Sequence, residues 1–214
     1  SVSKQFTALA ALMLVKDGTL SLDDDVGRFV PEVGGGRGAM RIRDLLYHTS
    51  GIRDYGTLEE LSGRLVTTMP EFLHLVAAQR ALNFTSGTTH EYSHSDYVLL
   101  AAVIESATGE PFARHMERTI FTPLGMTDTH VGDGSTVVAN RAVSHLRIGG
   151  EYRARYPTQV LMGGVSVYTS VQDWARWDRN FADGAVGGRD VVDQMTTLPT
   201  LANGDTIPYA YGLK

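Results

Sequence analysis

The first stretch of the chain, residues 1–16 with the sequence SVSKQFTALAALMLVK, combines a helical pattern with a candidate nucleophile. Its large apolar residues recur at spacings of three and four, which predicts an amphipathic helix. In such a helix Ser1 and Lys4 lie one turn apart on the same face. Burial disfavours the charged form of a lysine, so a buried amine there could take the serine proton. Alone the pair is weak evidence, because Ser-x-x-Lys occurs by chance about once in a chain of this length.

Composition narrows the classes of partner. The 214 residues suit one large domain or two small ones and can bury a substantial core. A formal net charge of −5 gives no basic field for nucleic acid or an anionic membrane. No apolar run approaches the roughly 20 residues that span a bilayer, and the absence of cysteine excludes disulfides and thiolate metal sites. We therefore expect no nucleic-acid partner and no membrane span in this segment.

The remaining pattern is mostly helical. Further helices are predicted over residues 42–47, 70–79, 96–108 and 111–121 and from Ser170 onward. The last of these is expected to bury Trp174, Trp177 and Phe181. Loose alternation around Gly149-Gly150 predicts a β-hairpin over residues 142–156. Residues 209–214 read as an unfinished strand.

A second candidate site, His90-Glu91-Tyr92-Ser93-His94, allows two interpretations. Read literally it matches H-E-x-x-H, in which two histidines one helical turn apart bind zinc and the glutamate acts as a base. That motif needs a long helix, whereas these residues follow the loop 85–89, and nothing marks Glu105, Glu110 or Glu117 as a third ligand. Zinc hydrolysis stays open as the less favoured alternative, and we expect no metal or other cofactor.

The other interpretation centres on Tyr92 in the loop before a strong helix. A phenol beside an ammonium group loses its proton more readily and can shuttle protons between a nucleophile and a leaving group. Ser93 and His94 would then supply hydrogen-bond donors to the lysine or the substrate. Of the other histidines, His48 is expected to brace a helix C-terminus and loop beneath the substrate cleft, and His115 to lie on the surface or in a loop.

These motifs together resemble the serine β-lactamase and DD-peptidase superfamily, in particular its class C β-lactamase-like branch, which also holds esterases and D-aminopeptidases. The resemblance rests on SVSK at 1–4, HTSG at 48–51 and YSH at 92–94, in this order and roughly this spacing. Supporting stretches occur throughout the chain, at residues 4–7, 20–24, 43–46, 97–100, 120–126 and 163–165.

The resemblance implies an α+β fold of the β-lactamase/transpeptidase type, an antiparallel sheet flanked by helices plus a mostly helical domain. It makes Ser1 the acylated nucleophile, Lys4 its activating lysine and Tyr92 the partner in acid/base work, with the backbone N–H of Ser1 as half of the oxyanion hole. His94 stands where the family usually has asparagine, and as a substrate-binding residue it would bring a charge that varies with pH. Ser86-Gly87 replaces the usual Pro-Gly before the tyrosine.

We therefore predict a serine hydrolase that acts through an acyl-enzyme on a small ester or amide: an esterase, a D-peptidase or a β-lactam hydrolase. A non-catalytic homologue that binds such ligands is the alternative. Residues 1–214 are expected to form one catalytic domain truncated at both ends, a mainly helical fragment without the N-terminal strands and the later sheet strands. The family's third motif would follow Lys214, so the segment alone is not expected to be a competent enzyme. The resemblance favours an extracytoplasmic location, periplasmic or secreted.

Overall fold

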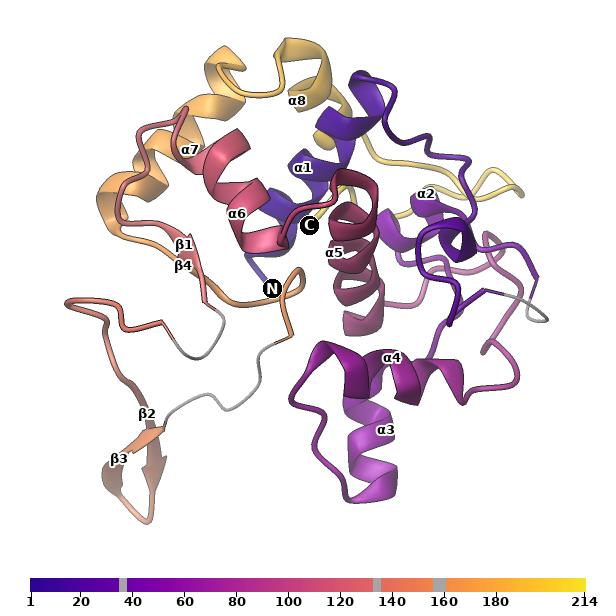
Figure 1. The fold of residues 1–214 in the computed structure, drawn as a ribbon, viewed down its shortest axis with the longest axis horizontal. Coiled ribbons are helices and arrows are strands. Elements are labelled where there is room, and N and C mark those ends of the chain that lie inside the picture. Colours follow the sequence, from indigo (N-terminus) through magenta and orange to yellow (C-terminus); the bar gives the residue numbers. More distant parts are fainter. Residues whose placement is uncertain (35–37, 133–135, 156–160) are drawn as a thin grey trace.

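The computed structural model describes residues 1–34, 38–132, 136–155 and 161–214. Figure 1 shows helices gathered around one long central helix, with short strands at the side. The helices are α1 (Lys4–Lys16), η1 (Val26–Arg28), α2 (Ile42–Leu46), α3 (Tyr55–Ser62), α4 (Met69–Ala77), α5 (His94–Thr108), α6 (Phe112–Met116), η2 (Glu117–Phe121), α7 (Val171–Asp183) and α8 (Arg189–Met195). The strands are β1 (His130–Val131), β2 (Ser144–Ile148), β3 (Glu151–Arg155) and β4 (Val167–Tyr168).

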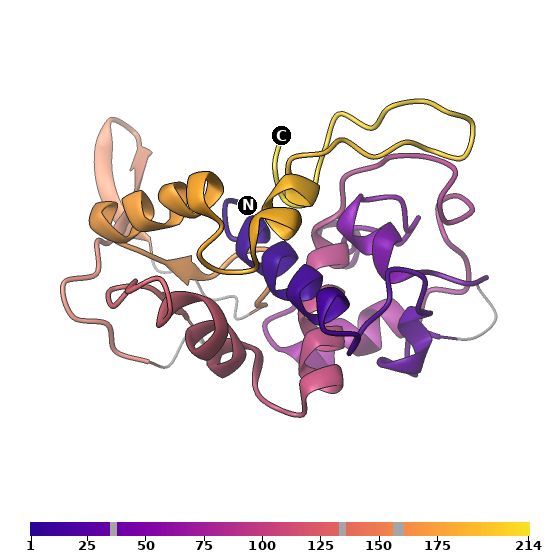
Figure 2. The ribbon, with the colours of Figure 1, turned by 90° about the horizontal axis from the view of Figure 1, so that it is seen from above.

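Helices α1 and α5 form the centre of the core. Nearly every residue of α1 is buried, and so are the ten successive residues of α5 from Ser95 to Ile104. A helix that is apolar on all sides belongs inside a protein, because no face of it favours water. Helix α1 packs against α5 on one side and α8 on another, as Figures 1 and 2 show. The start of α1 is thereby fixed in the middle of the molecule.

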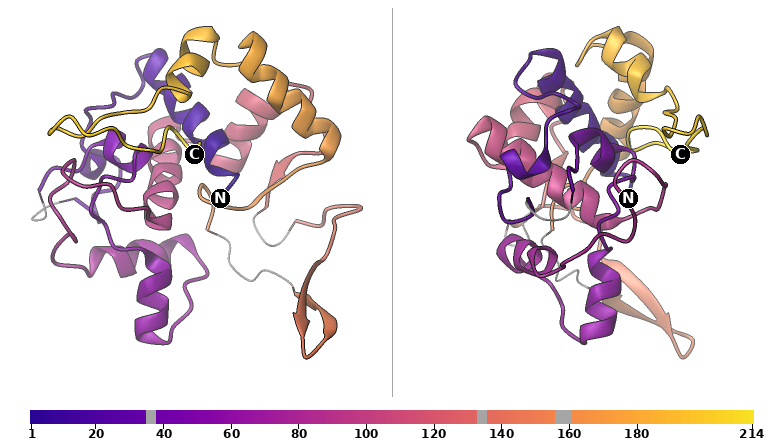
Figure 3. Two further views of the ribbon diagram at one scale, coloured as in Figure 1. Left: turned by 180° about the vertical axis from the view of Figure 1, so that it is seen from behind. Right: turned by 90° about the vertical axis from the view of Figure 1, so that its right-hand side faces the viewer.

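The predicted hairpin is confirmed as the antiparallel pair β2 and β3, which turns at Gly149-Gly150. Tyr156, the last residue of the predicted range, lies outside the described residues. Strand β1 pairs antiparallel with β4. Residues 209–214 form a turn closed by a bridge between Ala210 and Leu213 and not the predicted strand. Figures 2 and 3 show the two ends of the described chain close together at the start of α1.

The predicted burial of Trp174 and the predicted exposure of His115 were both wrong. Trp174 is 36% exposed, because α7 turns only one narrow side, carrying Trp177, toward the core. Trp177 packs against Phe6 with ring centroids 4.2 Å apart, and its Nε1–H donates to Gln5 Oε1 at 2.6 Å. His115 is buried and not on the surface, since Glu110 lies 2.9 Å from its Nδ1 and gives the polar ring a partner inside the protein.

Gly163 and Gly164 lie in close backbone contact with the first turns of the two central helices, α1 and α5. Gly163 has a φ of +96°, and a Cβ atom there would lie 2.1 Å from the Tyr97 carbonyl oxygen of α5. Thr7 of α1 donates its hydroxyl to the Gly163 carbonyl at 2.7 Å. Only glycine fits such a position. The next carbonyl, that of Gly164, is thus held against the start of α1.

Candidate active site

Ser1 and Lys4 meet at the beginning of α1. Ser1 lies in the turn just before the helix, and the Lys4 N–H donates to the Ser1 carbonyl at 3.1 Å. The Lys4 side chain is completely buried. Its Nζ donates to Ser1 Oγ and to the Gly164 carbonyl, both at 3.2 Å. These two hydrogen bonds hold the Lys4 amine beside the Ser1 hydroxyl.

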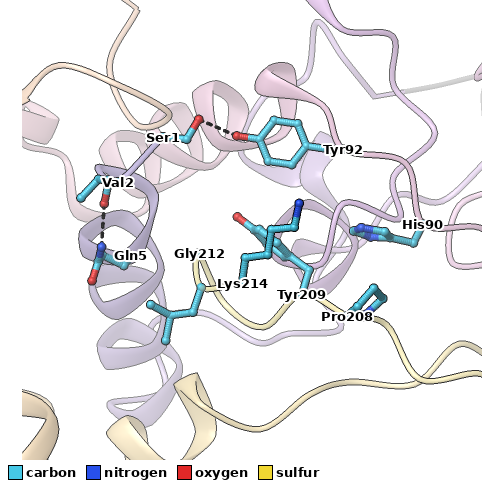
Figure 4. A pocket seen from close by; sticks show the side chains of 10 residues that line it. Ser1, Val2, Gln5, His90, Tyr92, Pro208, Tyr209, Gly212 and Lys214 are labelled. Carbon is cyan, nitrogen blue, oxygen red and sulfur yellow. Dashed lines mark hydrogen bonds between the residues drawn. The ribbon is translucent and has the colours of Figure 1, made fainter.

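Tyr92 reaches the same point from the loop before α5. Its hydroxyl oxygen lies 2.6 Å from Ser1 Oγ, and either group can donate in this hydrogen bond; Figure 4 shows the two side chains pointing at each other. Lys4 Nζ lies 5.0 Å from the centroid of the Tyr92 ring. The structure thus brings together three predicted residues, one of them 91 positions from Ser1. An amine and a phenol within reach of one hydroxyl can take its proton and return it to a leaving group.

Two imidazoles pack on Tyr92. The His48 ring centroid lies 4.4 Å from the Tyr92 centroid, and the His94 centroid lies 5.2 Å away at an angle of 88°. Each imidazole is paired through Nδ1 with its own carboxylate, His48 with Asp96 at 2.7 Å and His94 with Asp54 at 2.9 Å. The two pairs differ in environment, because His48 and Asp96 are fully buried whereas His94 is 42% exposed.

The different burial of the two pairs shifts the pKa values of their members differently. Burial, aided by the nearby Lys4 charge, lowers the pKa of His48 to about 2. Burial also raises the pKa of Asp96 well above its usual value. Burial alone would raise the pKa of Asp54 too, but the hydrogen bonds that Asp54 accepts from His94 hold its pKa below the usual value. The buried imidazole therefore stays uncharged near neutral pH.

A cavity of about 700 Å³ opens beside Ser1. Figure 4 shows Tyr92, His90 and Tyr209 around it, with Val2 and Gln5 on the side of α1. Its lining is Ser1, Val2, Gln5, His90, Tyr92, Pro208, Tyr209, Gly212, Leu213 and Lys214. A space of this size accommodates a small organic molecule with its reacting carbonyl near the serine.

The geometry does not favour the zinc interpretation. Helix α5 begins at His94, so His90 and Glu91 lie in the preceding loop and the two histidines do not share a helix face. His90 Nδ1 lies 2.9 Å from the Tyr47 carbonyl, and Glu91 accepts from the Asn83 side chain at 2.8 Å. Within the residues that the structure describes, no group of three or more His, Asp or Glu side chains is placed to hold a metal ion.

Several residues of the site were not predicted. Gly164 provides the second acceptor for Lys4, and its only signal was the Gly-Gly-Val stretch at 163–165. Asp54 and Asp96, the partners of the two imidazoles, carried no signal, because a lone aspartate in a sequence does not show which residue it faces. Tyr209, in the wall of the cavity, appeared only as part of the strand-like run.

The comparison with protein families concerns the chain as a whole. The family model described as Beta-lactamase matches residues 1–213, almost the whole chain. The chain belongs to the Beta-lactamase family. The β-lactamase/transpeptidase-like α+β fold predicted from the motifs is therefore confirmed, as is the recognition of this superfamily. The family is one of serine hydrolases, and the relatives of this chain include penicillin-binding proteins, D-aminopeptidases and carboxypeptidases.

The most similar proteins include peptidases and amidases. The chain is 27% identical over 231 residues to penicillin-binding protein 4* of Bacillus subtilis, covering 99% of this chain and 50% of that protein. It is 26% identical to the D-aminopeptidase of Gluconobacter oxydans, covering 100% and 41%. Among solved structures, the D-amino acid amidase of Ochrobactrum anthropi in complex with L-phenylalanine amide superposes with a TM-score of 0.79 at 27% identity, covering 99% and 63%. The chain thus spans about half the length, or less, of these curated relatives.

The Asp54–His94 pair should make part of the stability depend on pH. A carboxylate whose folded pKa lies below its unfolded value stabilises the protein above the unfolded pKa of about 4, and this contribution is lost as pH falls through the folded pKa. Asp54→Asn keeps an acceptor for the Gly56 N–H at the start of α3 but removes the charge. We expect its free energy of unfolding in urea to be lower than that of the unsubstituted protein at pH 6, and the difference to shrink as the pH falls from 4 toward 3. A difference that stays constant between these pH values would contradict this assignment.

Proposed function

We propose that the protein is a serine hydrolase of the Beta-lactamase family that cleaves small amides or esters through an acyl-enzyme on Ser1. The observation that carries the proposal is the contact of one hydroxyl, Ser1 Oγ, with both the Lys4 amine at 3.2 Å and the Tyr92 phenol at 2.6 Å. A serine hydroxyl is a weak nucleophile until a neighbouring base takes its proton. In this arrangement two such groups converge on it.

The reaction begins with the Ser1 hydroxyl. Its oxygen attacks the substrate carbonyl carbon and forms a C–O bond, while its proton passes to the Lys4–Tyr92 pair. The tetrahedral intermediate collapses, breaking the bond to the amine or alkoxide, which takes up that proton and leaves. Water then attacks the Ser1 ester in the same way, losing a proton to the pair, and the acid is released as the proton returns to Ser1 Oγ.

We assign the substrate class to small amides and esters, including amides of D-amino acids. Support comes from two relatives whose names state such activities, a D-aminopeptidase and a D-amino acid amidase. His94, beside Tyr92 and oriented by Asp54, would donate to the substrate carbonyl or to its polar groups. We assign residues 1–214 to one catalytic domain, for which the family model over 1–213 gives support.

The cellular location is part of the same proposal. Among the described residues no helix combines the length and the apolar character that a membrane crossing needs. We keep an extracytoplasmic site of action, for which the similarity to a penicillin-binding protein gives support.

Labelling with a fluorophosphonate tests the nucleophile directly. We expect the full-length protein to form one adduct, which mass spectrometry of its peptides locates on Ser1, and Ser1→Ala to form none. Hydrolysis of p-nitrophenyl acetate and of D-phenylalanine amide should disappear in the same variant, whereas Ser3→Ala, two residues away, should keep it. Failure of Ser1 to react under conditions that label another serine hydrolase would leave a ligand-binding homologue as the correct description. Hydrolysis of p-nitrophenyl acetate without turnover of D-phenylalanine amide would remove only the assignment to amides of D-amino acids.

A further inference from the structure

His48 has a set of contacts that its predicted bracing role does not explain. Its ring packs 4.4 Å from the Tyr92 centroid, and its backbone carbonyl accepts from the Glu91 N–H at 2.9 Å. The Ser93 N–H lies 3.4 Å from its Nδ1. One residue therefore touches the segment just before Tyr92, Tyr92 itself and the segment just after it.

The His48 ring is itself fixed in place. Its Nδ1 lies 2.7 Å from Asp96 Oδ2, and the other oxygen of Asp96 accepts from the Ser50 hydroxyl. Both side chains of the pair are fully buried. His48 adopts a φ of +57°, a left-handed conformation that few residues other than glycine take without strain. Such a conformation persists only where the surrounding contacts demand it, and here it directs the ring toward Tyr92.

We propose that His48 is a positioning residue for Tyr92: Asp96 fixes the neutral imidazole, and the imidazole holds the phenol ring so that its oxygen meets Ser1 Oγ. The inference rests on the proposed function, because positioning matters only if Tyr92 moves protons. A carboxylate that orients a histidine, which in turn serves the reacting group, is a known way to preorganise a site. Here the served group is a phenol, and the contact is between rings.

Neutrality is central to this role, since a charge on His48 would lie close to the Lys4 amine and change the balance of protons at Ser1. Titratable groups surround His48 on every side: Lys4 of α1, Asp54 before α3, His90 and Tyr92 of the loop, His94, Asp96 and Tyr97 of α5, and Tyr209. Burial dominates over all of them. Among the described residues His48 Nε2 has no hydrogen-bond partner, which also favours the uncharged ring.

The test compares acylation rates in single and double variants of the full-length protein. Asp96→Ala and His48→Ala should each slow fluorophosphonate labelling of Ser1 by about 10- to 100-fold, as expected for a small misplacement of a catalytic group. Asp96→Asn, which keeps the shape and a hydrogen bond to the ring, should recover most of the rate. In a Tyr92→Phe background His48→Ala should cost nothing further, because the hydroxyl that it positions is gone. An equal loss in both backgrounds overturns the proposal.

A matched control separates positioning from stability. His115 is also buried and paired with a carboxylate, Glu110, but neither residue lines the cavity beside Ser1. His115→Ala should lower the melting temperature without changing the labelling rate. If the His48 variants do not fold, the ¹⁵N chemical shifts of the unsubstituted protein decide. His48 should stay neutral from pH 5 to 9, and an imidazolium signal in that range overturns the proposal. Absence of Ser1 labelling in the unsubstituted protein would instead remove the proposed function.

Discussion

Replacing Lys4 with methionine should slow acylation of Ser1 by about 10³- to 10⁴-fold, the upper range for loss of a general acid–base group. Among the described residues, the Lys4 amine is the only nitrogen that is hydrogen-bonded to Ser1 Oγ. Methionine fills a similar volume without a proton acceptor of comparable strength. Because the loss falls on the chemical step, kcat and kcat/KM should fall together while the affinity for a reversible ligand is kept.

The same substitution should leave the protein folded and at least as stable. Lys4 is completely buried, and moving its polar amine out of water costs free energy that its two hydrogen bonds, to Ser1 and Gly164, only partly offset. Methionine removes this cost and leaves the Gly164 carbonyl unpaired, a smaller penalty. A gain in melting temperature together with a collapse of activity is the expected sign of a residue kept for chemistry.

Lys16→Met is the matched control, since it makes the same change at the other end of the same helix. Lys16 is half-exposed and pairs with Asp190 at 2.7 Å, a surface ion pair worth about 0–1 kcal/mol. Its loss should change neither the labelling rate nor kcat. Acylation by the Lys4→Met variant within tenfold of the unsubstituted protein would show that Tyr92 alone activates the serine.

Local patterns predicted the part of the site that is local in the chain. Ser1 and Lys4 are three residues apart, so helical spacing alone brings them together. Tyr92 was predicted through a resemblance of three motifs, because no periodicity relates it to Ser1. The partners that hold these side chains in place lie far away in the sequence. Asp54 and His94 are 40 residues apart, and Lys4 and Gly164 are 160 residues apart. Such pairings depend on the packing of α1 against α5, which a single sequence does not specify.

The loop before α5 illustrates the same limit. At position 86 serine replaces the proline that is usual in the family. Its hydroxyl donates to Asp44 Oδ2 at 2.8 Å. The Gly87 N–H donates to the Thr49 carbonyl at 2.8 Å, so the loop is tied to the segment after α2. Asp44 also accepts from Thr49 and from the Arg41 N–H. A buried carboxylate with several donors is a strong anchor, and only the folded chain shows that these groups meet.

Replacing Tyr92 with phenylalanine should lower the acylation rate by about 10²- to 10³-fold with little change in stability. The substitution removes the hydroxyl that lies 2.6 Å from Ser1 Oγ and keeps the ring. The packing of that ring with His48, His94 and the Lys4 amine does not need the oxygen. The free energy of unfolding should therefore stay within about 1 kcal/mol of its original value, the usual scale for one hydrogen bond.

Tyr47→Phe is the matched control, because it also removes one phenol hydroxyl but should leave the acylation rate unchanged. The Tyr47 hydroxyl is hydrogen-bonded to that of Tyr211, and neither residue lines the cavity beside Ser1. Its loss should therefore cost stability, about 1 kcal/mol, and no activity. The pH dependence adds a further distinction. If Lys4 and Tyr92 share the proton of Ser1, removing the phenol should also change the pH profile of kcat/KM, since the proton then has one acceptor in place of two. A Tyr92→Phe enzyme with an unaltered rate and pH profile would assign the proton transfer to Lys4 alone and reduce Tyr92 to a wall of the cavity.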